Sequence, residues 1–76
     1  MNEKYNQKAE RIQEEFLKNC KKYRENKRLT QIELAKRIGV IQQNINHLEC
    51  SGRNVTLLNL IKYLLGLGID INDLFK

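Results

Sequence analysis

Hydrophobic residues recur at spacings of three and four along the first third of the chain. Residues 3–27 contain neither glycine nor proline, so nothing in this stretch interrupts a helix. The pattern predicts one long first helix whose apolar stripe is Tyr5, Ala9, Ile12, Phe16, Cys20 and Tyr23. Residues 1–12 are polar enough to fray, and we interpret them as an extension that continues this helix. Residues 13–76 are expected to form one domain.

A second helix is predicted from a capping pattern. Residues 30–33 read Thr-Gln-Ile-Glu, in which the threonine hydroxyl and the glutamate carboxylate can each satisfy a free backbone N–H. Leu34, Ala35 and Ile38 then form an inner face. Gly39 can adopt the left-handed conformation that ends a helix.

A third helix is expected from about Ile41 to Cys50, after a turn at Val40. Ile45 and Leu48 face inward in this helix, and its other positions are almost all polar.

A fourth helix is capped by Thr56 and continues to about Leu65, where Gly66 and Gly68 stop it. A last short turn begins at Asp70 or Asn72 and ends in Leu74-Phe75. The sequence therefore predicts a compact all-α fold of five helices.

The second and third helices together have the pattern of a helix-turn-helix, over about residues 31–50. Ala35 is small where two helices would cross, and Val40 plugs the turn. The polar side chains of the third helix are then free to project outward. A polar helix face is usually only solvated, but such a face more often carries Glu and Lys than amides.

Residues 29–40, followed by Ile45, Leu48-Glu49 and the segment 69–75, resemble the Cro/repressor family of helix-turn-helix proteins, also called the Xre family. The resemblance covers roughly residues 16–75. It implies a lambda-repressor-like fold that binds DNA.

Two shorter segments resemble particular branches of this family. The pair Gln42-Gln43 is similar to the start of the recognition helix in lambdoid phage repressors. Residues 53–56 are similar to controller proteins of restriction-modification systems. Both branches are transcriptional regulators.

The resemblance implies DNA contacts along the second and third helices. Gln31 would hold a phosphate with the help of backbone N–H groups and the helix dipole. A glutamine amide donates and accepts together, which suits adenine N6 and N7. The expected base contacts are Ile41, Gln42, Gln43, Asn46 and His47. The expected phosphate contacts are Gln31, Arg28, Lys36, Asn44, Arg53 and Asn54, with Asn44 and Asn46 open to either kind of contact.

Two further positions resemble a structural pair of the family. Arg24 and Glu49 are expected to form a partly buried ion pair. The chain also departs from the family pattern. Ile41 replaces the usual Ser or Thr cap of the recognition helix, and Ser51 replaces a glycine that Gly52 can substitute for.

Charge and size add two expectations. The net charge of +5 and the pI of about 9.4 favour an anionic partner. A chain of 76 residues buries a modest core, and the fourth helix is more apolar than one buried face requires. Either this helix is the packed centre of the domain or it forms a homodimer contact. The expected dimer residues are Leu58, Leu65, Leu67, Ile69 and Phe75.

No cofactor or metal is expected. Cys20 and Cys50 form no CxxC motif, and His47 is the single histidine, so a zinc site has too few ligands. We expect both cysteines to be reduced, with Cys20 in the core. The chain has no glycine-rich phosphate loop and no nucleophile with a matching base, which argues against an enzyme. It also has no apolar run that could span a membrane, so we expect a cytoplasmic protein.

The sequence thus favours a transcriptional regulator, of repressor or controller type, that reads double-stranded DNA as a homodimer. Its two recognition helices would enter successive major grooves about 34 Å apart. The alternatives are an antitoxin whose main task is to bind a toxin protein, and a helical module that binds a protein or a membrane surface. Alternating charges along the first helix argue against a lipid-facing strip.

Overall fold

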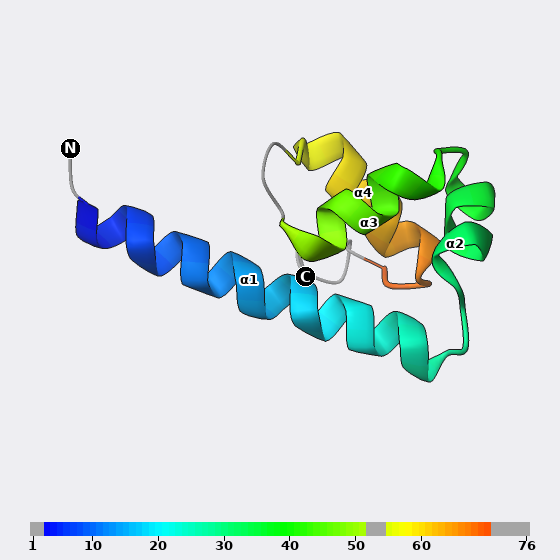
Figure 1. The fold of residues 1–76 in the computed structure, drawn as a ribbon, viewed down its shortest axis with the longest axis horizontal. Coiled ribbons are helices and arrows are strands. Elements are labelled where there is room, and N and C mark those ends of the chain that lie inside the picture. The colour runs from blue at the N-terminus through cyan, green and yellow to red at the C-terminus, as the bar shows by residue number, and fades with distance from the viewer. Residues whose placement is uncertain (1–2, 52–54, 71–76) are drawn as a thin grey trace.

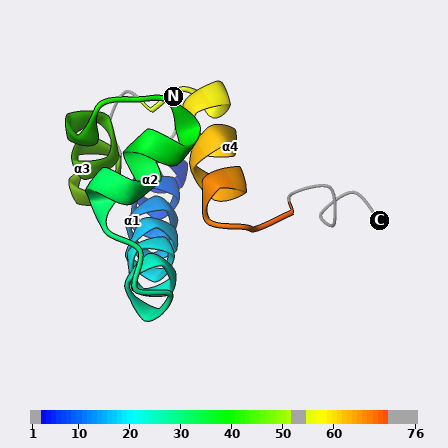
Figure 2. The ribbon, with the colours of Figure 1, turned by 90° about the vertical axis from the view of Figure 1, so that its right-hand side faces the viewer.

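The computed structural model describes residues 3–51 and 55–70, and these ranges are all-α, with four helices and no strand. The helix α1 runs along one side of a compact body, and its N-terminal half extends beyond the other helices (Figure 1). The body consists of the three shorter helices, which pack together over the C-terminal half of α1 (Figure 2). The helices are α1 Glu3–Asn26, α2 Gln31–Ile38, α3 Gln42–Cys50 and α4 Leu57–Gly66.

The start of each short helix follows from its first residues. Thr30 Oγ1 accepts from Glu33 N–H at 3.1 Å, and Glu33 Oε1 accepts from Thr30 N–H at 2.9 Å, which confirms the predicted capping box. Thr56 Oγ1 likewise accepts from Asn59 N–H at 3.1 Å. The helix α3 begins at Gln42, within one residue of the expected start, and its N-cap Ile41 makes no side-chain capping bond, as expected for a residue without a side-chain oxygen.

Left-handed residues end three of the helices. Gly39 ends α2 with φ 76° and Gly68 follows α4 with φ 86°. After α1 the same place is taken by Arg28, with φ 57°. There Leu29 N–H donates to Arg24 O at 3.2 Å, the long bond of a Schellman motif.

The core lies where the short helices meet the second half of α1. Its residues are Leu17, Cys20, Leu34, Ala35, Ile45, Leu48, Tyr63, Leu64 and Leu67. Cys20 is buried as predicted, and this burial raises the pKa of its thiol, with a smaller contribution from the nearby Glu49.

The predicted stripe of α1 is only in part its buried face. Cys20 is buried, but Tyr5, Ile12, Phe16 and Tyr23 are exposed, and the buried face is completed by Leu17 and Arg24. The two stripes lie side by side on the helix, and periodicity cannot tell which of them docks on the body. Only the C-terminal half of α1 has a body to dock on.

Three expectations for the last third of the chain change. Leu67 is fully buried in the protomer's own core, so it is withdrawn from the predicted dimer surface. Gly66 is the last residue of α4, whereas the sequence was expected to end the helix at about Leu65. The predicted fifth helix falls mostly within residues 71–76 and, with Phe75, lies outside the described residues. Within the described ranges, no helix is both long enough and apolar enough to cross a membrane.

Gly66 is needed because α2 approaches α4 closely at this point. A Cβ built on Gly66 would contact Ile38 Cγ2 and would lie 2.7 Å from Leu34 Cδ1. Leu34 is completely buried and has little room to move. We expect Gly66→Ala to lower the free energy of unfolding by about 1–3 kcal/mol, the usual effect of overpacking, as measured by urea denaturation.

A matched control is Asn59→Ala, an exposed position of the same helix, which should change the stability by about 0.5 kcal/mol or less. If Gly66→Ala is as stable as the control, the close approach of α2 and α4 is wrong.

Candidate nucleic-acid interface

The helix α3 presents one polar side to solvent. It lies on the outside of the body next to α2 (Figures 1 and 2). Ile45 and Leu48 are 2% and 5% exposed and anchor the helix to the core. The opposite side is made of exposed polar residues, which are Gln42, Gln43, Asn46 and His47.

Gln31, the first residue of α2, is bonded to this polar side. Its Nε2 donates to Glu49 Oε1 at 2.9 Å and to Asn46 Oδ1 at 3.3 Å. Its Oε1 accepts from Gln42 Nε2 at 3.2 Å. The two residues Gln42 and Asn46 are therefore positioned by a single amide of the neighbouring helix.

Glu49, on the inner side of α3, extends the network into the core. Arg24 Nε donates to Glu49 Oε2 at 2.8 Å, and Arg24 Nη2 donates to Oε1 at 3.0 Å, so the predicted ion pair is present and bidentate. Arg24 Nη1 also donates to Leu29 O at 2.8 Å. Arg24 and Glu49 are only 6% and 8% exposed.

The fourth helix contributes a hydroxyl to the same carboxylate. Tyr63 is fully buried, and its hydroxyl donates to Glu49 Oε2 at 2.6 Å. Burial raises the pKa of Glu49, but the hydrogen bonds from Arg24, Tyr63 and Gln31 outweigh it and hold the pKa below its usual range. Burial and the bond to Glu49 raise the pKa of Tyr63. Glu49 is thus a buried, fully bonded carboxylate.

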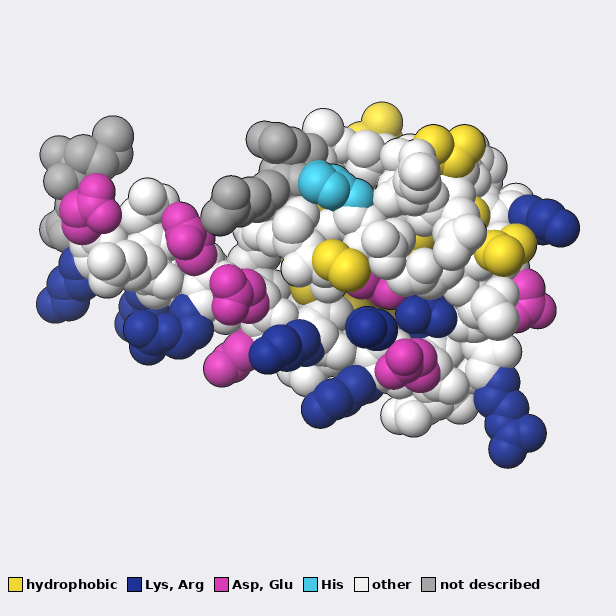
Figure 3. Space-filling view, in the orientation of Figure 1, with side chains coloured by type: hydrophobic (Ala, Val, Ile, Leu, Met, Phe, Trp, Pro, Cys, Tyr) yellow, Lys and Arg dark blue, Asp and Glu magenta, His cyan; other side chains and the backbone are white. Residues whose placement is uncertain are grey.

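This arrangement leaves the outer side of α3 without exposed acid. Glu49 is the single acidic residue of α3, and Arg24 neutralises it. In Figure 3 the histidine lies on a surface over α3 that shows little charge, and both basic and acidic side chains lie along the adjacent α1. Such a surface suits an approach to a polyanion.

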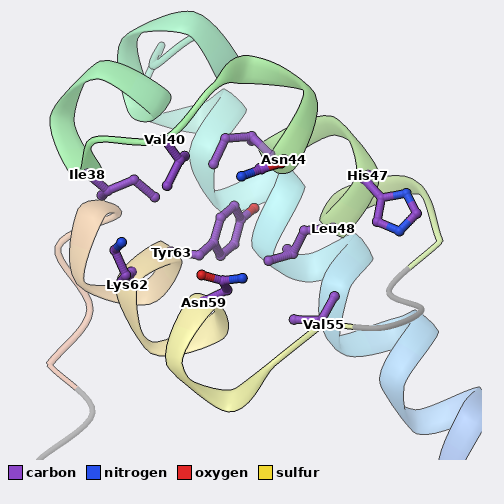
Figure 4. A pocket seen from close by; sticks show the side chains of 10 residues that line it. Ile38, Val40, Asn44, His47, Leu48, Val55, Asn59, Lys62 and Tyr63 are labelled. Atoms are coloured by element: carbon purple, nitrogen blue, oxygen red, sulfur yellow. The ribbon is translucent and has the colours of Figure 1, made fainter.

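A crevice of about 150 Å³ lies on another side of α3, between this helix, the turn before it and α4. Figure 4 shows Tyr63 in the crevice, with Asn44 and His47 on the α3 side and Asn59 and Lys62 on the α4 side. Asn44 therefore lies on a different side of α3 from Gln42 and Asn46, and His47, which also lines the crevice, lies at the border between the two sides. Within residues 3–51 and 55–70, no three His, Cys, Asp or Glu side chains gather in a way that could hold a metal ion.

Comparison with known proteins adds one decisive match. The family model described as helix-turn-helix matches residues 21–74, which is most of the chain. The chain belongs to the Cro/repressor, or Xre-type, family of helix-turn-helix proteins. It is accordingly a DNA-binding helix-turn-helix regulator. No curated protein matches the chain.

The helix-turn-helix brings three of the predicted contact residues, Gln31, Gln42 and Asn46, into hydrogen-bonding contact. Ile41, at the start of α3, is 63% exposed and lies beside the polar side of the helix. Lys36 and Arg28 are also exposed, on α2 and at the end of α1. Arg53 and Asn54 lie outside the described residues. The DNA contacts of all these residues remain predictions.

Sequence reasoning missed the role of Tyr63, which it treated only as part of an apolar helix. A buried tyrosine normally needs a partner for its hydroxyl, and that requirement was the available signal.

Two basic residues also have a role that the sequence did not show. Arg37 Nη1 donates to Gly66 O at 3.0 Å, and Lys27 Nζ donates to Leu67 O at 2.9 Å. Both hold the C-terminal end of α4, where free carbonyls favour cations.

The ion pair of the helix-turn-helix leads to a stability prediction. Arg24→Ala leaves Glu49 buried without its counter-charge, and we expect a loss of about 3–5 kcal/mol in the free energy of unfolding. The measurement is urea denaturation followed by circular dichroism. Lys21→Ala, an exposed cation of the same helix, is the control and should change the stability by about 0.5 kcal/mol or less. Equal stability of the two variants would contradict a structural role for the pair.

The pKa of Glu49 leads to a pH prediction. Because this pKa is lower in the folded than in the unfolded state, Glu49 stabilises the fold above about pH 4.3, and the contribution is lost as the pH falls through the folded pKa. The stability difference between wild type and Glu49→Gln should therefore shrink as the pH is lowered from 6 towards 3. Glu33, whose pKa is also lowered by its bonds to Thr30, is present in both proteins and cancels. A constant difference over this range would refute the assignment.

Proposed function

We propose that the chain is a sequence-specific transcriptional regulator, of repressor or controller type, that binds double-stranded DNA as a homodimer. The observation that carries this proposal is the network from Glu49 through Gln31 to Gln42 and Asn46. It holds two amide side chains in place on an exposed helix side that has no exposed acid. Holding a long side chain before binding saves about 0.5–1.5 kcal/mol of ordering cost per residue.

The base contacts are assigned to the polar side of α3, which would enter the major groove of the DNA. Gln42 uses one N–H on Gln31, so its second N–H and its Oε1 remain for a base edge. Gln43, Asn46 and His47 extend along the same side, and Ile41 is placed to meet a thymine methyl group.

The phosphate contacts are assigned to residues on α3 and on the elements around it. The amide group of Gln31 is already engaged by Glu49 and Asn46, so its expected phosphate contact is assigned to its backbone N–H at the N-terminus of α2. Other contacts are assigned to Arg28, Lys36, Asn44, Arg53 and Asn54. Binding should weaken steeply with salt, because cations that neutralise phosphates release counterions.

The dimer is assigned to the exposed apolar side of α4. Leu58 and Leu65 are 67% and 56% exposed, although they belong to a mostly apolar helix. Ile69, which follows the end of α4 in the sequence, is half-buried. If a two-fold axis passes through this surface, the second protomer supplies its own α3, which would bind a second half-site of the DNA.

The test is selection of bound duplexes from a random DNA pool at physiological salt. Wild type should enrich an inverted repeat. Gln42→Ala/Gln43→Ala should lose about tenfold to a hundredfold of its preference for that repeat, because a bidentate base contact contributes about 1–3 kcal/mol of discrimination.

The control is Asn6→Ala/Gln7→Ala, which removes two amides from the far end of α1 and should leave selection unchanged. If wild type enriches no sequence, the proposal fails and a role in binding a protein partner, as in an antitoxin, takes its place.

A further inference from the structure

The N-terminal half of α1 is a helical arm with an exposed surface. Every residue from 3 to 16 is exposed, and this arm extends beyond the body (Figure 1). The side of the arm that Figure 3 shows carries both acidic and basic side chains. A helix of this length is marginal in water by itself, since most helical stability comes from packing of an apolar face.

The arm has such an apolar face, and it is uncovered. Tyr5, Ala9, Ile12 and Phe16 follow one another at intervals of four, three and four residues, the spacing of a helix-pairing seam. Tyr5 is 72% exposed, Ile12 59% and Phe16 43%. The seam ends at Phe16, and the next residue, Leu17, is buried in the core.

We propose that this arm pairs with the same arm of a second copy of the chain, in antiparallel orientation. The seam then matches large side chains to small ones. Ala9 lies opposite Ile12 of the partner subunit, and Tyr5 lies opposite Phe16 of the partner subunit, each contact occurring twice about a two-fold axis.

The charges beside the seam favour this orientation. Lys8 and Glu15 are the basic and acidic residues that flank it on one side, and the antiparallel register places Lys8 opposite Glu15 of the partner subunit, again twice. A parallel pair would instead place Gln13 and Cys20 of the partner subunit opposite these charges. Cys20 is unavailable for this because it is buried in its own core.

The contact between the two arms can extend onto an apolar groove between α1 and α4. Phe16, Leu17, Leu57 and Leu60 line an apolar groove of about 240 Å³, and Leu57 is 72% exposed. The antiparallel register brings the partner's Tyr5 to Phe16, at the edge of this groove. The four aromatic residues of the pair, two from each chain, bury at most about 150–250 Å² each, so the pair covers at most roughly 1,000 Å², the lower end of specific interfaces, and we expect a reversible association.

The contact is separate from the α4 surface assigned above to the DNA-binding dimer. Leu57 and Leu58 point about 100° apart on the helix, so the groove and that surface face different directions. The inference therefore does not depend on DNA binding, and either proposal can fail without the other.

The experiment reverses the flanking charges and measures self-association by sedimentation equilibrium without DNA. All proteins carry Leu58→Glu/Leu65→Glu, which removes the α4 surface from the measurement. Lys8→Glu and Glu15→Lys each turn two attractions into two repulsions, so each should raise the dissociation constant about tenfold. The double variant Lys8→Glu/Glu15→Lys should return to the starting value.

An equimolar mixture of the two single variants gives the sharpest result. One chain then has Glu at both positions and the other has Lys at both, so the mixture should form a heterodimer as tight as the parent dimer. The control pair, Arg11→Glu and Glu14→Lys, makes the same charge changes away from the seam and should alter neither the separate proteins nor their mixture.

Two results would overturn the proposal. One is a parent protein that stays monomeric at millimolar concentration while circular dichroism shows it folded. The other is a pair of single variants that associate no differently alone and mixed.

Discussion

The carboxylate of Glu49 is the point at which all four helices of the described structure meet. It belongs to α3 and accepts hydrogen bonds from Arg24 of α1, Gln31 of α2 and Tyr63 of α4. A buried charge is costly unless it is paired and hydrogen-bonded, so a shift of any one helix would leave this group short of a partner. Among the described residues, every buried side-chain nitrogen and oxygen has a hydrogen-bond partner. The constraint acts on the arrangement of the helices as much as on their stability.

The same carboxylate connects the core to the surface that reads DNA in our proposal. Gln31 lies between them, since one amide bonds Glu49 on the inside and both Gln42 and Asn46 on the outside. A protein of this size has few buried residues with which to hold a recognition helix. It does so with two apolar anchors, Ile45 and Leu48, and one polar network. The position of the reading side chains is therefore set by contacts that also hold the fold together.

The two halves of α1 have different roles. The second half supplies Leu17, Cys20 and Arg24 to the body, so it belongs to the DNA-binding domain. The first half is exposed throughout its described residues and presents an apolar seam bordered by charges. One continuous helix transmits the orientation of the body to the arm, because a helix without glycine or proline has no built-in hinge. Pairing of such arms would hold two bodies at a defined separation.

The sequence by itself determined what depends on neighbouring residues. The capping box at Thr30, the cap at Thr56 and the left-handed Gly39 could be predicted because each rests on contacts within one or two helical turns. The inward Ile45 and Leu48 could be predicted because they are the apolar positions of an otherwise polar helix.

Only the tertiary structure decided which faces meet. It buried Leu17 and left Tyr5, Ile12, Phe16 and Tyr23 exposed, took Leu67 into the core and joined the Tyr63 hydroxyl to Glu49. Periodicity shows that a helix has an apolar side, but the choice among neighbouring sides depends on the shape and the unpaired polar groups of distant elements. Those are brought together only when the chain has folded.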